Sequence, residues 1–139
     1  TGDTPIERAQ LLVLKTDIHY LLSQIHQRHG RTHVARQYLA KAAEGSGSSA
    51  HVASYEYGRI LLRKLAQPEM ARTYLRKFLE GKTAYDLVDD AELLICESYV
   101  KQMNAKQAGK CFQDVLERFP TPLVKRRVQN MKTTLRLNR

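Results

Sequence analysis

Residues 91–120 read AELLICESYVKQMNAKQAGKCFQDVLERFP, and this stretch decides the fold. Cys96, a small residue, lies among apolar residues at helical spacing, and Ala108 begins a second apolar stripe after a turn at Asn104. Apolar positions three to four residues apart in each half predict two amphipathic helices. Small residues at facing positions allow two helix axes to approach to about 8–10 Å. The stretch therefore predicts an antiparallel pair of closely packed helices.

The same arrangement recurs twice earlier in the chain. The small residues of the first helices, 35 and 38 residues apart, are Ser23, Gly58 and Cys96. The alanines of the second helices, 36 and 37 residues apart, are Ala35, Ala71 and Ala108. A period of this length with two helical faces per unit is typical of helical repeat arrays. One pair cannot bury its apolar stripe alone, so neighbouring pairs are expected to stack into an all-α solenoid.

Local start and stop signals predict about seven helices. Thr4-Pro5-Ile6-Glu7 predicts a capped helix start, and Gly30 predicts a left-handed end near His29. Between them a helical stripe is formed by Leu11, Leu14, Ile18, Leu22 and Ile25. A second helix is expected from about Val34 to Ala42, followed by a loop at 45–49. Later helices are expected over about 52–65, after Pro68, after a second capping box at 83–86, after Asn104 and after Thr121-Pro122. In the last helix the residues expected to point inward are Leu123, Val124, Val128, Met131 and Leu135.

The third unit carries a pattern that resembles the tetratricopeptide repeat family. That family follows Trp-x2-Leu-Gly-x2-Tyr, then Ala-x3-Phe, then Pro. The matching residues here are Ile95, Cys96, Tyr99, Ala108, Phe112 and Pro120. The resemblance covers roughly residues 16 to 120, although the chain has no Trp and the first two units lack the Pro. It implies a single domain over 1–139, with three repeats at about 16–49, 50–82 and 87–120. The repeats would form a right-handed stack that ends in a solvating helix at 121–137.

The resemblance implies a non-enzymatic adaptor, scaffold or assembly factor. Such arrays hold a peptide or helix of a larger complex in a concave groove lined by the first helix of each pair. The groove residues would be Asp17, Tyr20, Gln24, Gln27, Arg28, Tyr55, Arg59, Leu62, Arg63, Asp90, Leu93, Glu97, Val100 and Lys101. A mixed aromatic and polar lining suits an extended peptide or a helix. Alternatively, Tyr20 and Tyr55 pack between adjacent repeats.

Charge offers a second hypothesis. The chain has 23 Lys and Arg against 14 Asp and Glu, for a net charge of +9. A basic C-terminal patch could bind nucleic acid or an anionic membrane, and it consists of Lys125, Arg126, Arg127, Lys132 and Arg136. The spread of basic residues along the rest of the chain favours an ordinary solvated helical surface instead. Self-association through the open ends of the array is a third hypothesis.

Catalytic and metal sites are not expected. No nucleophile elbow, phosphate loop or dinucleotide motif occurs, and no cofactor is implied. His26, His29 and His33 are close in sequence, but Gly30 separates the last from the others and no Cys or carboxylate joins them. The two cysteines of the chain lie on apolar helix faces, which predicts buried free thiols. No stretch approaches the ~20 apolar residues of a membrane span. Short arrays of this kind favour a bacterial envelope or periplasmic setting, with the cytoplasm left open.

Overall fold

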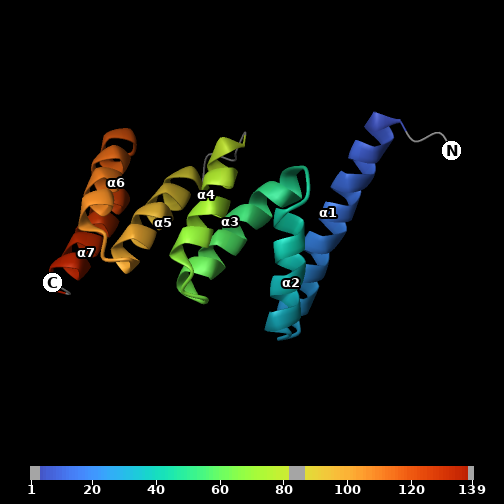
Figure 1. The fold of residues 1–139 in the computed structure, drawn as a ribbon, viewed down its shortest axis with the longest axis horizontal. Helices are drawn as coiled ribbons and strands as arrows, with labels where there is room; N and C mark the ends of the chain where they lie inside the picture. The colour runs from blue at the N-terminus through green and yellow to red at the C-terminus, as the bar shows by residue number, and fades with distance from the viewer. Residues whose placement is uncertain (1–3, 82–86, 138–139) are drawn as a thin grey trace. The chain divides into compact units, whose positions relative to one another are not determined.

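The computed structural model describes residues 4–81 and 87–137. Over these ranges the chain forms seven α-helices and no strand, which confirms the all-α prediction. In chain order (Figure 1) the helices are α1 (Pro5–Arg28), α2 (Thr32–Ala43), α3 (Ser48–Arg63), α4 (Pro68–Glu80), α5 (Val88–Lys101), α6 (Ala105–Arg118) and α7 (Pro122–Leu137). They belong to two compact units, Thr1–Tyr57 and Gly58–Arg139, whose boundary falls within α3.

Local signals mark where several helices begin and end, as the sequence predicts. At the start of α1, Thr4 Oγ1 accepts a hydrogen bond from the Glu7 amide and Glu7 Oε2 accepts one from the Thr4 amide, at 3.1 and 3.0 Å. Pro68 begins α4, and the Asn104 side chain caps α6 by accepting from the Gln107 amide. Gly30 follows α1 with a φ of +73°, the left-handed conformation expected for a helix end.

Two boundaries differ from expectation or fall outside the structure. Helix α3 begins at Ser48, four residues before the predicted start at Val52. The sequence predicts a loop at 45–49, but Ser48 and Ser49 are helical, and the Ser49 hydroxyl donates to Asp17 of α1 at 2.7 Å. The predicted capping box at 83–86 lies outside the described residues.

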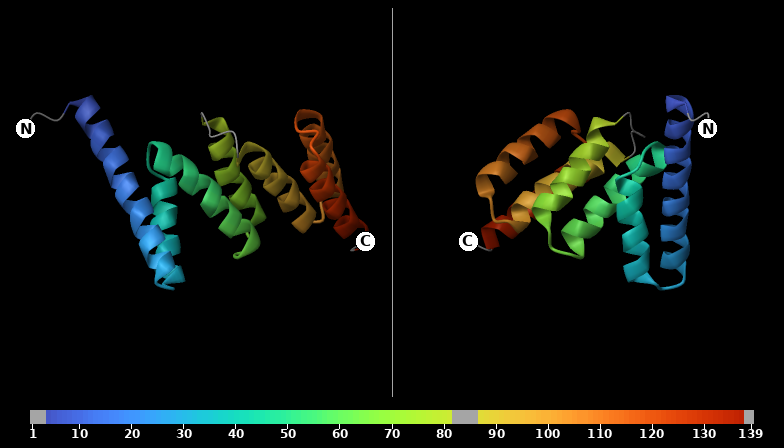
Figure 2. Two further views of the ribbon diagram at one scale, coloured as in Figure 1. Left: turned by 180° about the vertical axis from the view of Figure 1, so that it is seen from behind. Right: turned by 45° about the vertical axis from the view of Figure 1, so that its right-hand side comes forward.

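In the first unit, α1 and α2 lie side by side, as the views of Figures 1 and 2 agree. The buried side of α1 carries small polar residues, Thr16 and Ser23. Thr16 Oγ1 donates to the Leu12 carbonyl and accepts from the Ser46 amide, which ties the α2–α3 loop to α1. A Cβ on Gly45 would come within 2.0 Å of that hydroxyl oxygen, so the loop approaches α1 at van der Waals distance.

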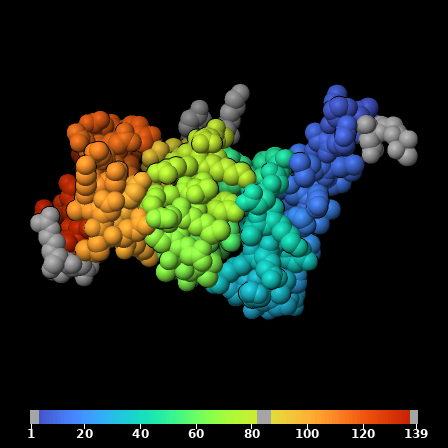
Figure 3. All heavy atoms as spheres, viewed as in Figure 1, coloured from blue at the N-terminus to red at the C-terminus, as the bar shows by residue number. Residues whose placement is uncertain are grey.

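The apolar stripe of α1 faces outward. An apolar stripe on a helix ordinarily faces the protein core. Here the large apolar residues that remain exposed on this one helix are Ile6, Leu11, Leu12, Val13, Leu14, Ile18, Leu21 and Ile25. Helix α1 has 24 residues against 12 in α2, and its N-terminal half projects past α2 in the space-filling view of Figure 3.

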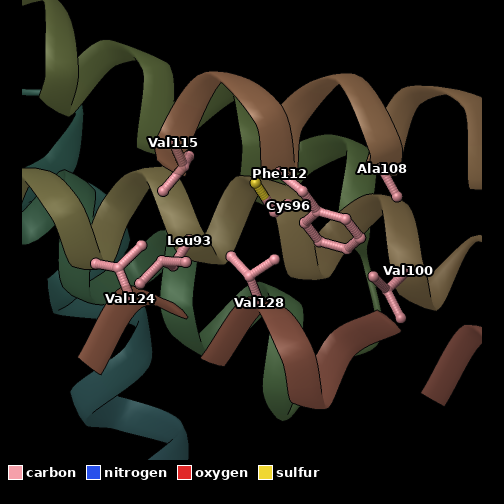
Figure 4. Close-up of a cluster of buried hydrophobic side chains, with 8 residues drawn as sticks. All are labelled: Leu93, Cys96, Val100, Ala108, Phe112, Val115, Val124 and Val128. Carbon is pink, nitrogen blue, oxygen red and sulfur yellow. The ribbon is translucent and has the colours of Figure 1, made fainter. Parts of the chain in front are cut away.

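In the second unit, small residues allow close helix packing as predicted. A Cβ added to Gly58 would lie 2.9 Å from Leu75 Cγ and 3.3 Å from the Ala71 carbonyl oxygen. Helices α5, α6 and α7 enclose the cluster of buried side chains drawn in Figure 4, in which Val124 and Val128 point from α7 toward the other two helices. Met131 and Leu135 are partly buried against this cluster. The expectation that Leu123 points inward is wrong, because its side chain is exposed.

Within residues 4–81 and 87–137, no helix is both long enough and apolar enough to cross a membrane.

Candidate functional site

In the first unit, two of the expected groove residues make contacts between helices. The Tyr20 hydroxyl on α1 donates to Glu56 Oε1 on α3 at 2.7 Å, and Asp17 accepts from Ser49. Burial, together with the hydrogen bond to Glu56, raises the pKa of Tyr20, so the phenol stays protonated as a donor. These contacts correspond to the alternative in which Tyr20 packs between helices. The remaining groove candidates on α1 are exposed, and they are Gln24, Gln27 and Arg28.

Four groove candidates are buried, and their expected exposure is wrong. Tyr55 is only 6% exposed, and the other three, between 0% and 5% exposed, are Leu62, Leu93 and Val100. The physical reason is that these large apolar side chains share the inward side of α3 and α5. Leu93 and Val100, for example, belong to the buried cluster of α5, α6 and α7. A partner could reach none of these four side chains without unfolding the helices around them.

The polar groove candidates of the second unit lie at or near the surface, and four of the five are engaged in polar contacts within the unit. Arg63 binds Glu97 through two hydrogen bonds of 3.1 Å each. Lys101 Nζ donates to the Leu62 carbonyl at 3.4 Å. Asp90 forms an ion pair with Arg127, while Arg59 is exposed. Exposed ion pairs of this kind contribute about 0–1 kcal/mol each, so they hold a surface in place more than they stabilise the fold.

The two cysteines form a disulfide, so the prediction of free thiols is wrong. Cys96 of α5 bonds to Cys111 of α6, with their Cα atoms 5.4 Å apart. Cys96 is at the close-packed position of α5, and Cys111 is one turn beyond Ala108 on the same side of α6. The close approach predicted from Cys96 and Ala108 therefore also brings the second thiol within bonding range.

An open pocket of about 420 Å³ lies beside Cys111, between α4, α5 and α6. Leu79 and Ile95 supply apolar surface, Tyr99 supplies an aromatic ring, and Cys111 forms part of the wall. The charged side chains that line it are Arg76, Glu92, Lys110, Asp114 and Arg118. Three of these five are cationic, so the pocket carries a positive excess.

The charged residues of the pocket are arranged by their hydrogen bonds. Arg118 bonds to both Glu92 and Asp114, at 2.8 and 2.6 Å. Burial opposes the charge on Arg118, but the two carboxylates outweigh it and raise the pKa of the guanidinium. On the opposite wall, Arg76 donates to the Tyr99 hydroxyl at 2.8 Å. The acids of the pocket are thus bound to Arg118, whereas Arg76 and Lys110 bring cationic groups that these acids do not neutralise.

Tyr99 is held in position from its other side. The guanidinium of Arg72 lies 4.3 Å from the centre of the Tyr99 ring, a cation–π contact. Arg72 is itself fixed by donating to Ser98 Oγ at 2.9 Å and to Gln102 Oε1 at 2.7 Å. The ring that lines the pocket is therefore oriented before any partner arrives.

The basic patch of α7 is only partly available. Lys125, Arg126 and Arg136 are exposed, and Lys132 is half-buried. Arg127 is bound to Asp90. Exposed cations on one helix attract phosphate groups by charge alone, without a shaped site.

The histidines of the α1–α2 turn are engaged locally. His26 accepts from Arg31 Nε at 2.7 Å and stacks on Tyr38, with ring centres 5.5 Å apart. His29 Nδ1 lies 2.9 Å from the Ile25 carbonyl oxygen, and His33 contacts Gln37. Across the described ranges, no three His, Cys, Asp or Glu residues come together as a metal ion would require.

Sequence reasoning missed the pocket. Lys110, Asp114 and Arg118 are four residues apart on α6 and therefore share one face, which is a recognisable signal. That Arg76 and Leu79 of α4 face them could not be known without the packing of α4 on α5. No protein-family model, curated protein or solved structure matches the chain. The contacts described above are therefore what indicates its function.

Proposed function

We propose that this chain is a non-enzymatic protein-interaction module that holds an acidic segment of a larger assembly in the α4–α6 pocket. The pocket's mixed lining carries the proposal: Leu79 and Ile95 offer apolar contact while Arg76 and Lys110 offer cationic donors. Apolar contact gives affinity and charged donors fix register, which suits a peptide or the face of a helix. An Asp or Glu beside an apolar residue is the partner chemistry that fits.

We also propose that the helices form three tetratricopeptide-like repeats, α1–α2, α3–α4 and α5–α6, closed by α7 as a solvating helix. The small residues at the expected crossings support this, because Ser23, Gly58 and Cys96 are all buried. The close approach of Gly58 to Ala71 and Leu75 supports it further. A scaffold or adaptor role is the usual use of such arrays.

The disulfide bears on the compartment. Structural disulfides persist in oxidising surroundings and are rare where cellular thiols keep cysteines reduced. The Cys96–Cys111 bond therefore favours an oxidising compartment, of which the bacterial periplasm is one, over the cytoplasm.

The experiment that tests the pocket is selection from a library of random displayed peptides, followed by affinity measurement on the enriched peptides. The pocket variant carries Arg76→Glu with Lys110→Glu. The matched control carries Lys125→Glu with Arg126→Glu, which makes the same change of charge on exposed α7 residues. We expect enrichment of Asp and Glu next to apolar residues and a loss of about 10-fold or more in affinity for the pocket variant alone.

Three outcomes would contradict the proposal. Equal loss in both variants would mean that binding responds only to net charge. Loss in the α7 variant alone, with affinity falling steeply as salt rises, would move the function to the basic patch and an anionic surface. Failure to enrich any peptide family would remove the pocket as a peptide site. Thermal unfolding of both variants, measured alongside, shows whether either substitution disturbs the fold.

A further inference from the structure

The outward stripe of α1 has the spacing of a coiled coil. Its central residues, between 36% and 59% exposed, are Leu11, Leu14, Ile18, Leu21 and Ile25, here called the α1 seam. Their separations alternate between three and four residues, which is the heptad repeat that keeps two wound helices in contact. A stripe that packs on a globular core usually has a wider face and does not need this strict alternation.

The rest of the first unit occupies the opposite side of α1. Thr16 and Ser23 are buried, and they occupy the same position of two successive heptads, directly across the helix from the seam. Between the two sides, Tyr20 binds Glu56 and His26 stacks on Tyr38. The side of α1 that carries Thr16, Tyr20 and Ser23 thus packs within the first unit, while the seam residues remain exposed.

The residue types in the seam indicate what that helix is. Leu11, Ile18 and Ile25 take the first apolar position of their heptads, two of the three being Ile, and Leu14 and Leu21 take the second. Ile at the first and Leu at the second position favours two parallel strands over higher oligomers. A parallel pair places each seam residue against the same residue of its partner. A second copy of α1 therefore supplies the matching Ile and Leu residues, and no other helix is needed to complete the pair.

Charge permits the same pairing. The whole chain carries +9, and two copies would repel each other over most surfaces. Helix α1 carries only Arg8, Lys15 and Arg28 against Glu7 and Asp17, so it is close to neutral. Self-pairing along α1 thus brings together one of the least repulsive parts of the molecule.

We propose that the α1 seam is a homodimer interface in which two copies pair as a short, parallel, two-stranded coiled coil. Each seam side chain is about half exposed, and a fully buried Leu or Ile removes roughly 100 Å² of apolar surface from water. Ten half-exposed side chains then bury on the order of 500 Å² of apolar surface, which is less than the roughly 1,200–2,000 Å² of total surface that stable, specific interfaces bury. The dimer is accordingly weak, with a dissociation constant on the order of 10–100 µM. It does not involve the α4–α6 pocket.

The test is sedimentation velocity of the full chain from about 5 to about 200 µM, a range that brackets this affinity. The seam variant carries Leu14→Glu with Leu21→Glu, which sets like charges against each other across the parallel pair. The matched control carries Leu12→Glu with Leu123→Glu, two exposed apolar residues outside the seam. We expect reversible dimers for the wild type and the control, and at least about a 100-fold weaker association for the seam variant.

A rescue experiment separates direct pairing from damage to the fold. A second seam variant carries Leu14→Lys with Leu21→Lys, and it should be monomeric alone but pair with the Glu variant when the two are mixed. Restoration of a dimer in the mixture supports the parallel pairing, and its absence overturns it. A monomeric wild type at all concentrations overturns the proposal. Binding of that monomer to vesicles of anionic lipid, lost in the seam variants, would assign the seam to a membrane surface instead.

Discussion

Reduction of the Cys96–Cys111 disulfide should destabilise the second unit by a predictable amount. The bond closes a loop with a sequence separation of 15 residues between α5 and α6. Closing a loop of this size removes conformational entropy from the unfolded chain worth about 3 kcal/mol. For a protein of this size that corresponds to a fall in melting temperature of roughly 10 °C.

The folded state should change little on reduction. Cys96 is fully buried beside Phe112 and Val128, and those apolar contacts remain when the sulfur–sulfur bond is broken. The start of α6, the helix that carries Cys111, is capped locally by Asn104 and does not depend on the cysteines. The expected effect is therefore almost entirely on stability, with helical content unchanged at 25 °C.

The assay is thermal unfolding followed by far-ultraviolet circular dichroism, with and without a phosphine reductant. The variant Cys96→Ala with Cys111→Ala is the control, because its melting temperature should match that of the reduced wild type and should not respond to reductant. A wild-type shift of less than about 2 °C would refute the loop-entropy argument. Titration of two free thiols in protein prepared without reductant would show that the bond does not form at all.

Three further predictions concern packing and pH. Gly58→Ala gains about 1 kcal/mol in helix propensity, but its Cβ would crowd Leu75 Cγ at 2.9 Å. We therefore expect the free energy of unfolding, measured by chemical denaturation, to stay unchanged or to fall by up to about 2 kcal/mol. Tyr55→Ala should lower the free energy of unfolding by about 3–5 kcal/mol, since the ring is buried. An unchanged free energy of unfolding would show that the Tyr55 ring is exposed. Burial lowers the pKa of His51, so the unfolded chain takes up the proton first and stability should fall as pH drops below about 6.5. His51→Gln should flatten that dependence in melts between about pH 5 and about pH 8, and an equal slope in both proteins would contradict it.

Helix limits could be predicted from the sequence because caps act over three or four residues. The Thr4–Glu7 capping box, Pro68 at the start of α4 and the left-handed Gly30 are all local features, and each is found where expected. The prediction of the α3 start was wrong because the Ser-rich segment is locally typical of a loop, whereas in the fold it contacts α1. The serines before Val52 resemble a loop in isolation, but α3 begins at Ser48, and Ser49 bonds to Asp17 of α1.

The direction in which each helix faces could not be predicted so well. The strongest apolar stripe of α1 is exposed, and its buried side carries Thr16 and Ser23, whose hydroxyls find backbone partners. Periodicity gives the spacing of a face but does not say which neighbour covers it. The same limit explains why Tyr55 and Leu93 were expected at a surface, although both are buried. Leu93, for example, is buried because α5 packs on α6 and α7.

The disulfide also bears on how the pocket would bind. Cys111 forms part of the pocket wall and is joined through Cys96 to the buried cluster of α5, α6 and α7. Two of the three helices that form the pocket are therefore fixed to each other covalently, and Tyr99 is held by Arg72 and Arg76. A site that is ordered before binding loses less conformational entropy when a partner docks, so a shallow surface can still bind specifically. The α1 seam has no such support and depends on apolar area alone, which is why the affinity expected of it is weak and varies with protein concentration.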